Sequence, residues 1–359
     1  MTSSNDTKCF FPTADINDSE ITRDLLHEIN FSNCSAEPNW IAFQNDTITI
    51  RPKAIETHGN ITCTIEFFKL LTDFEVKTVQ ITRMSSNVTA KTDFFNAKCN
   101  ADDQKTYSNY HATIVPSDDA LNRTKRMPAD AVPLNIYIIG FDTVSRLEFM
   151  RKMKQTYKYI TDELKGTIME MYNVISDGIK RDVLATLTGM TEEELPDTRR
   201  FQKRNVSFVD VYPFIWNELK EMGYVTFYAE DKPTLGTFQY RLKGFKKQPT
   251  DHYLRSMYVR RENDSFDSKL KDCFGDEHAL HVQFSYVEKF FTSYPRGRLK
   301  FAFQFFVQFK HHDNNYIKMA DHMTVDHLKF FNGNFCIFQF SLSHQVLLKC
   351  SNKDDHKVQ

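Results

Sequence analysis

From residue 134 onward, short apolar runs alternate with helical segments, and this alternation restricts the possible folds more than any other feature. Residues 134–141, LNIYIIGF, have the length and the Ile content of a buried strand. Apolar residues then recur at steps of three and four, as on one face of a helix, and Gly166 follows where we expect a C-terminal cap. Repeated strand–helix units favour a mainly parallel sheet with helices on both faces.

The same alternation predicts the remaining elements of this region. We expect strands near residues 167–173, 224–228 and 300–309, and helices over residues 181–189, 212–223 and 277–297. In sheets of this kind, ligands bind at the carboxyl ends of the strands.

Three predicted strands end in side chains that suit a metal ion or a phosphate group: Asp142 with Thr143, Glu230 with Asp231, and His311, His312 with Asp313. Adjacent histidines point to different sides of an extended chain, so at most one of that pair is expected to face a metal. The alternative for Asp142, Thr143 and Ser145 is capping of the helix that begins near Ser145, and Ser145 with Glu148 has the spacing of a capping box.

Residues 1–130 have a different pattern. Thr-rich segments such as DTITIRP and VKTVQITRM alternate apolar and polar residues, as strands do. Cys9, Cys34, Cys63 and Cys99 form an even set, which suits two disulfides in an oxidising compartment but allows three pairings. We therefore expect a small disulfide-bonded, β-rich module over residues 1–130, with a polar linker at residues 115–133, and an α/β domain over residues 131–333.

N-linked glycans are expected at nine Asn-x-Ser/Thr sequons, against about three that chance would give. These are Asn5, Asn17, Asn33, Asn45, Asn60, Asn87, Asn122, Asn205 and Asn263. Together with the cysteines, they predict an extracellular or secretory-pathway glycoprotein. The sequence has no run of about 20 apolar residues that would span a membrane, so we expect an export or anchoring segment outside it.

The net charge of −1 and the absence of a strongly basic segment argue against a nucleic-acid partner. The runs RRFQKR and KGFKK are expected to be solvated faces, and the sequence identifies no other partner.

Several of these segments resemble the family catalogued as domain of unknown function 229, whose members are extracellular or membrane-anchored animal proteins. The resemblance rests on GFDTVSR, YNVISDG, LATLTGM, YAEDKPTLGTFQYRLKGF, QPTDHYLR, CFGDEHALH and KHHD, and on the N-terminal cysteines. It implies an alkaline-phosphatase/sulfatase-like fold and a metal-dependent site that cleaves or transfers phosphate or sulfate esters.

The resemblance also implies roles for individual residues. Asp142, His312 and Asp313 resemble metal ligands, with zinc as the first candidate if the chain binds a divalent metal at all. Glu230 and Asp231 lie where the family keeps acids. His252 is either a substrate contact or part of a structural loop.

Two departures from the family pattern are expected to impair catalysis. Ile179 stands where family members carry a nucleophilic Thr, and its side chain has no lone pair with which to attack phosphorus or sulfur. The family's later Asp-His metal motif is missing, and residues 334–359 form an atypical, Phe-rich tail for which we expect no packing site in the domain.

The remaining cysteines and histidines have less definite roles. The resemblance implies a disulfide partner for Cys273, and seven cysteines leave at least one thiol unpaired or intermolecular. His278 and His281 lie one helical turn apart and are expected on an exposed helix face rather than at a zinc ion.

The leading hypothesis is therefore an extracellular glycoprotein that resembles metal-dependent ester hydrolases but is catalytically impaired. The alternative is an active phosphoesterase, sulfatase or phosphotransferase that uses Thr143 or Ser145.

Overall fold

The fold is taken from a computed structural model, which describes residues 15–19, 34, 37–44, 46–169, 174–175, 179–201, 205–264, 272–307, 314–331, 336–341 and 344–347. Cys9, His312, Asp313 and the sequon residues Asn5, Asn33 and Asn45 lie outside this part of the chain.

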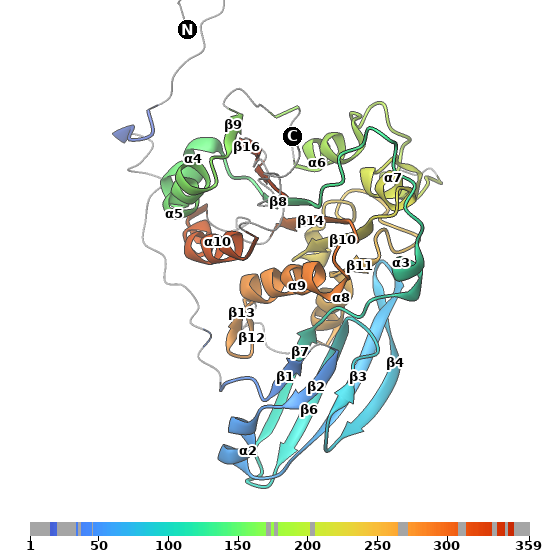
Figure 1. The fold of residues 1–359 in the computed structure, drawn as a ribbon, viewed down its shortest axis with the longest axis vertical. Helices are drawn as coiled ribbons and strands as arrows, with labels where there is room; N and C mark the ends of the chain where they lie inside the picture. The colour runs from blue at the N-terminus through green and yellow to red at the C-terminus, as the bar shows by residue number, and fades with distance from the viewer. Residues whose placement is uncertain are drawn as a thin grey trace, which may run out of the picture.

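A seven-stranded sheet forms the centre of the larger part of the molecule (Figure 1). Across the sheet, the strands are β11 (His252–Tyr253), β10 (Val225–Glu230), β14 (Lys300–Phe306), β8 (Ile136–Phe141), β15 (Cys336–Ser341), β16 (His344–Leu347) and β9 (Thr167–Met169). The first five strands are parallel, and β16 is antiparallel to both of its neighbours. The predicted α/β class with a mainly parallel sheet is confirmed.

Strand β14 is buried on both faces, because its side chains alternate between two apolar clusters. Phe303 and Phe305 pack with α6 (Ile179–Thr188) and α7 (Ile215–Glu221). On the other face, Ala302 and Phe306 pack in the cluster that includes α4 (Arg146–Lys152), α8 (Arg255–Asn263), α9 (Ala279–Ser293) and α10 (Ile317–Phe331). Helices therefore cover both faces of the sheet.

The helix expected after β8 is divided into three pieces. Helix α4 is followed by α5 (Lys154–Lys158) and by a π-helical turn at Tyr159–Glu163. The left-handed residue that ends it is Lys165, with φ of 51°, and the Gly166 N–H donates to the Ile160 carbonyl at 2.9 Å. The expected cap therefore forms one residue earlier than Gly166, through a non-glycine residue.

The N-terminal region forms two antiparallel sheets, seen at the bottom of Figure 1. The smaller contains β1 (Ile41–Gln44), β2 (Thr47–Ile50) and β5 (Val88–Thr89), and helix α2 (Pro52–His58) follows β2. The larger has the order β4 (Glu75–Met84), β3 (Ile61–Thr72), β6 (Phe94–Ala101) and β7 (Thr106–Ala112). Trp40, Phe67 and Phe95 lie in their shared core. The region is β-rich, as its alternating pattern predicts.

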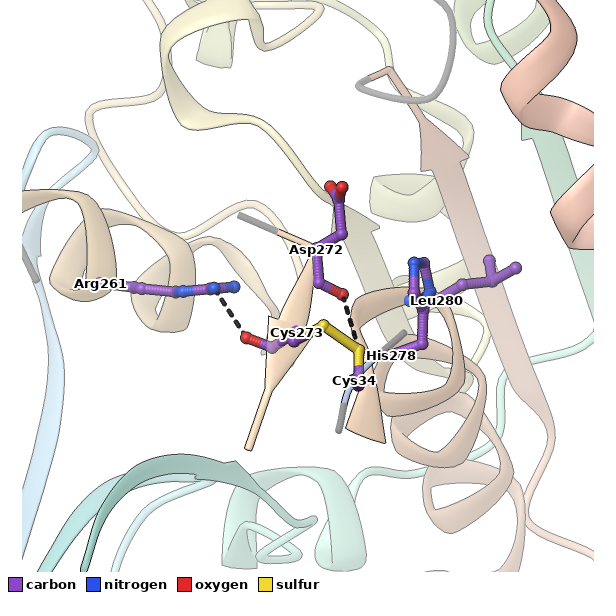
Figure 2. Close-up of a disulfide and its surroundings, with 6 residues drawn as sticks. All are labelled: Cys34, Arg261, Asp272, Cys273, His278 and Leu280. Atoms are coloured by element: carbon purple, nitrogen blue, oxygen red, sulfur yellow. Dashed lines mark hydrogen bonds between the residues drawn. A yellow bond between two sulfur atoms is a disulfide. The ribbon is translucent and has the colours of Figure 1, made fainter. Parts of the chain in front are cut away.

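Among the residues that the structure describes, two disulfides are formed, and one of these lies within the N-terminal region. Cys63 and Cys99 are directly opposite on β3 and β6, with Cα atoms 4.0 Å apart. Cys34 bonds Cys273, which is 239 residues away at the start of the hairpin of β12 (Cys273–Phe274) and β13 (Glu277–His278) (Figure 2). The expectation that the N-terminal cysteines pair among themselves is therefore wrong for Cys34.

The physical reason is that the chain after Cys34 runs beside this hairpin. The Asn39 N–H donates to the Asp276 carboxylate at 3.1 Å. On the opposite side, Arg261 donates to the Cys273 carbonyl at 2.8 Å (Figure 2). The sulfur atoms are thus brought together by tertiary packing and not by nearness in sequence.

The β3–β4 hairpin joins the N-terminal sheets to the α/β part. The carboxylate of Asp73, in the hairpin turn, accepts from Gln239 Nε2 at 2.8 Å and from the Phe245 N–H at 2.9 Å. It also lies 3.2 Å from Arg255 Nε. Gly244, with φ of +73°, is required here, because a Cβ atom would meet an Asp73 oxygen at 2.5 Å.

The predicted linker is docked on the α/β part. It contains helix α3 (Asp118–Asn122), whose N-cap Ser117 accepts from the Ala120 N–H at 3.2 Å. Arg123 then donates to both oxygens of Asp251, at 2.9 and 2.8 Å. Polar composition alone does not distinguish a free linker from one fixed by ion pairs.

The expectation that the tail has no packing site is wrong for two segments. The backbone of β15 pairs with β8 along its whole length, and β16 connects β15 to β9. Strand β8 would otherwise present a row of unpaired backbone groups on that edge, which is costly for a buried strand.

Candidate functional site

The candidate site lies at the carboxyl ends of β10, β14 and β8, which are adjacent in the sheet. Phe306 on β14 is opposite Phe141, the last residue of β8, and Phe305 is opposite Glu230, the last residue of β10. The Asp142 N–H donates to the Phe306 carbonyl at 2.8 Å. The sequence-predicted acids after β8 and β10 are therefore brought to one edge of the sheet.

Val307 lies between these two strand ends. Its N–H donates to Asp231 Oδ1 at 2.8 Å, so the Asp231 carboxylate links the end of β10 to the residue after β14. Asp231 and Asp142 are both buried, with exposed fractions of 3% and 5%. At least one oxygen of Asp231 thus stabilises the backbone here.

Glu230 also has a structural role. Its Oε1 accepts from both the N–H and the hydroxyl of Thr237, at 2.9 and 2.6 Å, and its Oε2 accepts from the Tyr228 hydroxyl at 3.0 Å. Burial raises the pKa of Glu230, and the bonds from Thr237 and Tyr228 oppose that rise. The carboxylate closes the loop that follows β10.

The two hydroxyls after β8 differ in their surroundings. Ser145 Oγ accepts from the Glu148 N–H at 3.2 Å, so Ser145 is the N-cap of α4. Thr143 is exposed and has a φ of 51°. A β-branched residue is strained in this left-handed conformation, and strain of this kind often occurs at functional sites.

Ile179 is the first residue of α6. The carboxylate of Asp182, in the first turn of α6, accepts from the Ile175 N–H at 2.7 Å. Val183 and Leu184 of α6 belong to the same apolar cluster as Phe305 and Val307. The helix that begins at Ile179 therefore packs on a face of the sheet that extends to the candidate site.

The implied metal has too few ligands in the described part of the chain. No three His, Cys, Asp or Glu side chains lie close enough to hold an ion within the ranges given above. Residues 308–313, which include His312 and Asp313, continue directly from Val307 and are not among them. Asp142 alone does not make a metal centre, so any such centre requires ligands from outside the described residues, and His312 and Asp313 are the candidates that the resemblance names.

His252 does not lie at the strand ends. It is opposite Phe227, in the middle of β10, and is buried. Its Nδ1 is 2.6 Å from Asp93 Oδ2, and its Nε2 is 2.7 Å from the Tyr294 hydroxyl. Of the two interpretations that the sequence leaves open, this geometry favours the structural one.

The expectation that His278 lies on an exposed helix face is also wrong. It is buried rather than exposed, and its Nδ1 accepts from the Leu280 N–H at 3.2 Å, which caps α9 (Figure 2). His281, one turn later, is exposed.

The sequence does not reveal the polar groups that surround the end of β10. Arg255, Gln239 and Asp73 are all buried near Glu230, and Gln239 Nε2 also contacts the Tyr253 hydroxyl at 3.0 Å. Arg255 lowers the pKa of Glu230, against the effect of burial. No motif in the sequence groups these residues, because Asp73 belongs to the N-terminal region whereas Gln239 and Arg255 belong to the α/β part.

These features define a mixed α/β protein with a parallel sheet, two disulfides and a cluster of acids at one sheet edge. Comparison with protein families matches residues 27–337 to the family described as protein of unknown function, DUF229. The chain belongs to this family. No curated protein matches it significantly.

Among the described residues, no helix combines the length and the apolar character needed to cross a membrane.

Proposed function

We propose that the protein is an extracellular glycoprotein with an alkaline-phosphatase/sulfatase-like fold and a catalytically impaired site at the strand ends. It functions as a binding ectodomain rather than as an ester hydrolase. The observation that carries this proposal is Ile179 at the first position of α6, where the family resemblance places a nucleophilic Thr. A hydrocarbon side chain cannot form a covalent intermediate with phosphate or sulfate.

The acids at the sheet edge support the same conclusion. Glu230 is bound by Thr237 and Tyr228, and Asp231 by the Val307 N–H. Ligands for a catalytic metal are usually oriented by such groups but keep an open side for the ion. Here the bonds on Glu230 occupy both of its oxygens.

The extracellular assignment is supported by the surface and by the cysteines. All six sequon asparagines in the described ranges are exposed: Asn17, Asn60, Asn87, Asn122, Asn205 and Asn263. A further sequon, Asn30-Phe31-Ser32, lies outside those ranges. Cys34–Cys273 and Cys63–Cys99 are stable disulfides only in an oxidising compartment.

The test is an assay of aryl phosphate and aryl sulfate turnover with added zinc, calcium or magnesium. Loss of a nucleophile costs about a millionfold in kcat in a protease example, so the unmodified chain should not exceed a no-enzyme control. Ile179→Thr alone should also remain inactive, because the hydroxyl would lack a metal to activate it. Ile179→Thr joined to an intact family C-terminus should show turnover. Clear turnover by the unmodified chain would refute the impaired-enzyme proposal.

One observation favours a second candidate, an active phosphotransferase or hydrolase with Thr143 as nucleophile. Thr143 is exposed, strained and adjacent to the buried Asp142. If the unmodified chain is active, Thr143→Val should abolish turnover. Ser145→Ala should then leave turnover measurable, because Ser145 caps α4.

A further inference from the structure

The two basic runs of the sequence, separated in the chain, lie side by side in the fold. Arg199 forms an antiparallel bridge with Leu242. The Arg200 N–H donates to the Arg241 carbonyl at 3.0 Å, and the Lys243 N–H donates to the Thr198 carbonyl at 2.8 Å. We call residues 197–201 and 240–247 the basic loop pair.

The basic loop pair concentrates positive charge. It carries the cations Arg199, Arg200, Arg241, Lys243, Lys246 and Lys247, of which only Lys243 is half-buried and the others are exposed. Asp197 is the single acid within it, and it pairs with Arg199 at 2.9 Å. The whole chain has a net charge of −1, so this positive charge is a local property.

Three of these cations are available to a ligand. In the described part of the chain, Arg241, Lys246 and Lys247 have no carboxylate within ion-pair distance. The backbone N–H groups of Lys246 and Lys247 donate to Asp210, at 2.7 and 3.0 Å, which fixes the turn and leaves their side chains exposed. Residues 241 to 247 span at most about 20 Å, a distance over which a polymer presents several anionic groups.

Aromatic rings extend the same surface. Phe201 is 83% exposed and Tyr240 is 51% exposed. Phe201 follows Arg199 by two residues and Tyr240 precedes Leu242 by two, so both residues leave the same end of the antiparallel bridge. The guanidinium carbon of Arg200 lies 5.9 Å from the centre of the Phe201 ring, and that of Arg241 lies 6.0 Å from the Tyr240 ring.

We propose that the basic loop pair binds a polyanionic polysaccharide, a sugar polymer that carries sulfate or carboxylate groups. The cations pair with the anionic groups, and the exposed ring faces pack against the apolar faces of the sugars. Planar guanidinium groups suit sulfate and carboxylate oxygens in particular. This binding does not depend on ester hydrolysis or on any residue of the strand-end site.

The disulfides favour a polysaccharide over the other two polyanions. Stable disulfides belong to an oxidising, extracellular-type compartment, whereas the anionic lipid leaflet faces the cytoplasm. Nucleic acids are also largely intracellular. Polyanionic sugars are the abundant polymers of matching charge outside cells.

The test measures binding of the full, secreted and glycosidase-trimmed chain to immobilised heparin over a range of salt concentrations. Trimming removes a glycan from Asn205, which is next to Val206, the acceptor of a hydrogen bond from Lys243 Nζ. The variant Arg241→Ala/Lys246→Ala/Lys247→Ala should bind about 10- to 100-fold more weakly, with a log–log salt slope smaller by about 2. The same charge change on the N-terminal sheets, Lys77→Ala/Lys98→Ala/Lys105→Ala, should have little effect.

Phe201→Ala/Tyr240→Ala should weaken binding but keep the salt slope. Circular dichroism and the thermal midpoint show whether each variant is folded. The proposal is overturned if the folded chain does not bind heparin more tightly than it binds neutral dextran, or if both triple variants lose affinity equally. It is also overturned if the chain binds vesicles of phosphatidylserine and phosphatidylcholine or single-stranded DNA through these residues but does not bind heparin.

Discussion

Two groups of buried carboxylates lie in different parts of the molecule. Both accept hydrogen bonds from backbone N–H groups, but their donors lie at different separations along the sequence. At the junction between the N-terminal sheets and the α/β part, Asp73 accepts from the Phe245 N–H, 172 residues away. At the carboxyl end of β10, Glu230 accepts from the Thr237 N–H, seven residues away. The junction acids therefore join distant segments, whereas Glu230 shapes a local loop.

A second junction acid behaves like the first. Asp93 binds His252 at 2.6 Å, the Tyr286 hydroxyl at 2.7 Å and the Val115 N–H at 2.8 Å. The comparison teaches that an acid after a strand is not by itself a sign of catalysis. It also predicts that substitutions at the junction cost more stability than substitutions at the strand ends.

The largest effect is expected for Asp73→Ala. Its removal leaves the buried guanidinium of Arg255, which is 3.2 Å away, without its carboxylate partner. Breaking a buried pair on one side costs about 3–5 kcal/mol, and guanidinium unfolding should measure this loss. The control Asp197→Ala removes a partly exposed acid paired with Arg199 and should cost less than about 1 kcal/mol. Equal losses of unfolding free energy in the two variants would show that the buried Asp73 contributes no more to stability than a partly exposed acid.

Removing the long-range disulfide should have the next largest effect. Disulfides of folded domains contribute about 2–4 kcal/mol, and the chain-entropy model gives more for longer loops. Cys34→Ser/Cys273→Ser should therefore destabilise at least as much as Cys63→Ser/Cys99→Ser, since the sequence separations are 239 and 36. A clearly greater loss of unfolding free energy in Cys63→Ser/Cys99→Ser would mean that the Cys34–Cys273 bond can open without unfolding the core.

A smaller effect is expected at the strand end. Glu230→Gln keeps an oxygen for the bonds from Thr237 and removes a charge that burial disfavours. The loss should be about 1 kcal/mol, as for a single hydrogen bond, and should be measured in the same unfolding assay. A loss as large as that of Asp73→Ala would contradict the distinction between the two groups of acids.

Much of the α/β fold could be predicted from sequence, because its elements are local and strongly periodic. Strands β8, β10 and β14 and helices α6, α7 and α9 form within a few residues of the predicted limits. The parallel topology then places Asp142 and Asp231 at one edge.

What could not be predicted depends on tertiary contacts. The Cys34–Cys273 bond, the pairing of β15 with β8 and the docking of Arg123 on Asp251 join segments that carry no mutual signal in one sequence. Asp73 is an acid in a hairpin turn, a common position for an exposed residue, and its role is shown by tertiary contacts with Gln239, Phe245 and Arg255.

The smallest predicted effect depends on pH and concerns His58, the last residue of α2 in the N-terminal region. Its ring is buried, Nδ1 lies 2.8 Å from Asp103, Nε2 contacts Glu37, and the Trp40 ring lies 4.7 Å away. The bond to Asp103 raises the pKa of His58 most, the bond to Glu37 adds to this, and burial opposes them. Because the folded pKa is above 6.5, this stabilisation is complete below pH 6.5 and is lost as pH rises through the folded value.

The free energy of unfolding of the unmodified chain should therefore fall as the pH rises above 6.5, and His58→Gln should make the curve flatter there. The exposed His322 of α10 provides the matched control, and His322→Gln should leave the curve unchanged. Measurement above pH 5 keeps the Asp103 carboxylate ionised, because its bond to His58 lowers the pKa of Asp103. An identical pH dependence in the His58→Gln variant would show that His58 is not the titrating group and that these contacts contribute only through neutral hydrogen bonds.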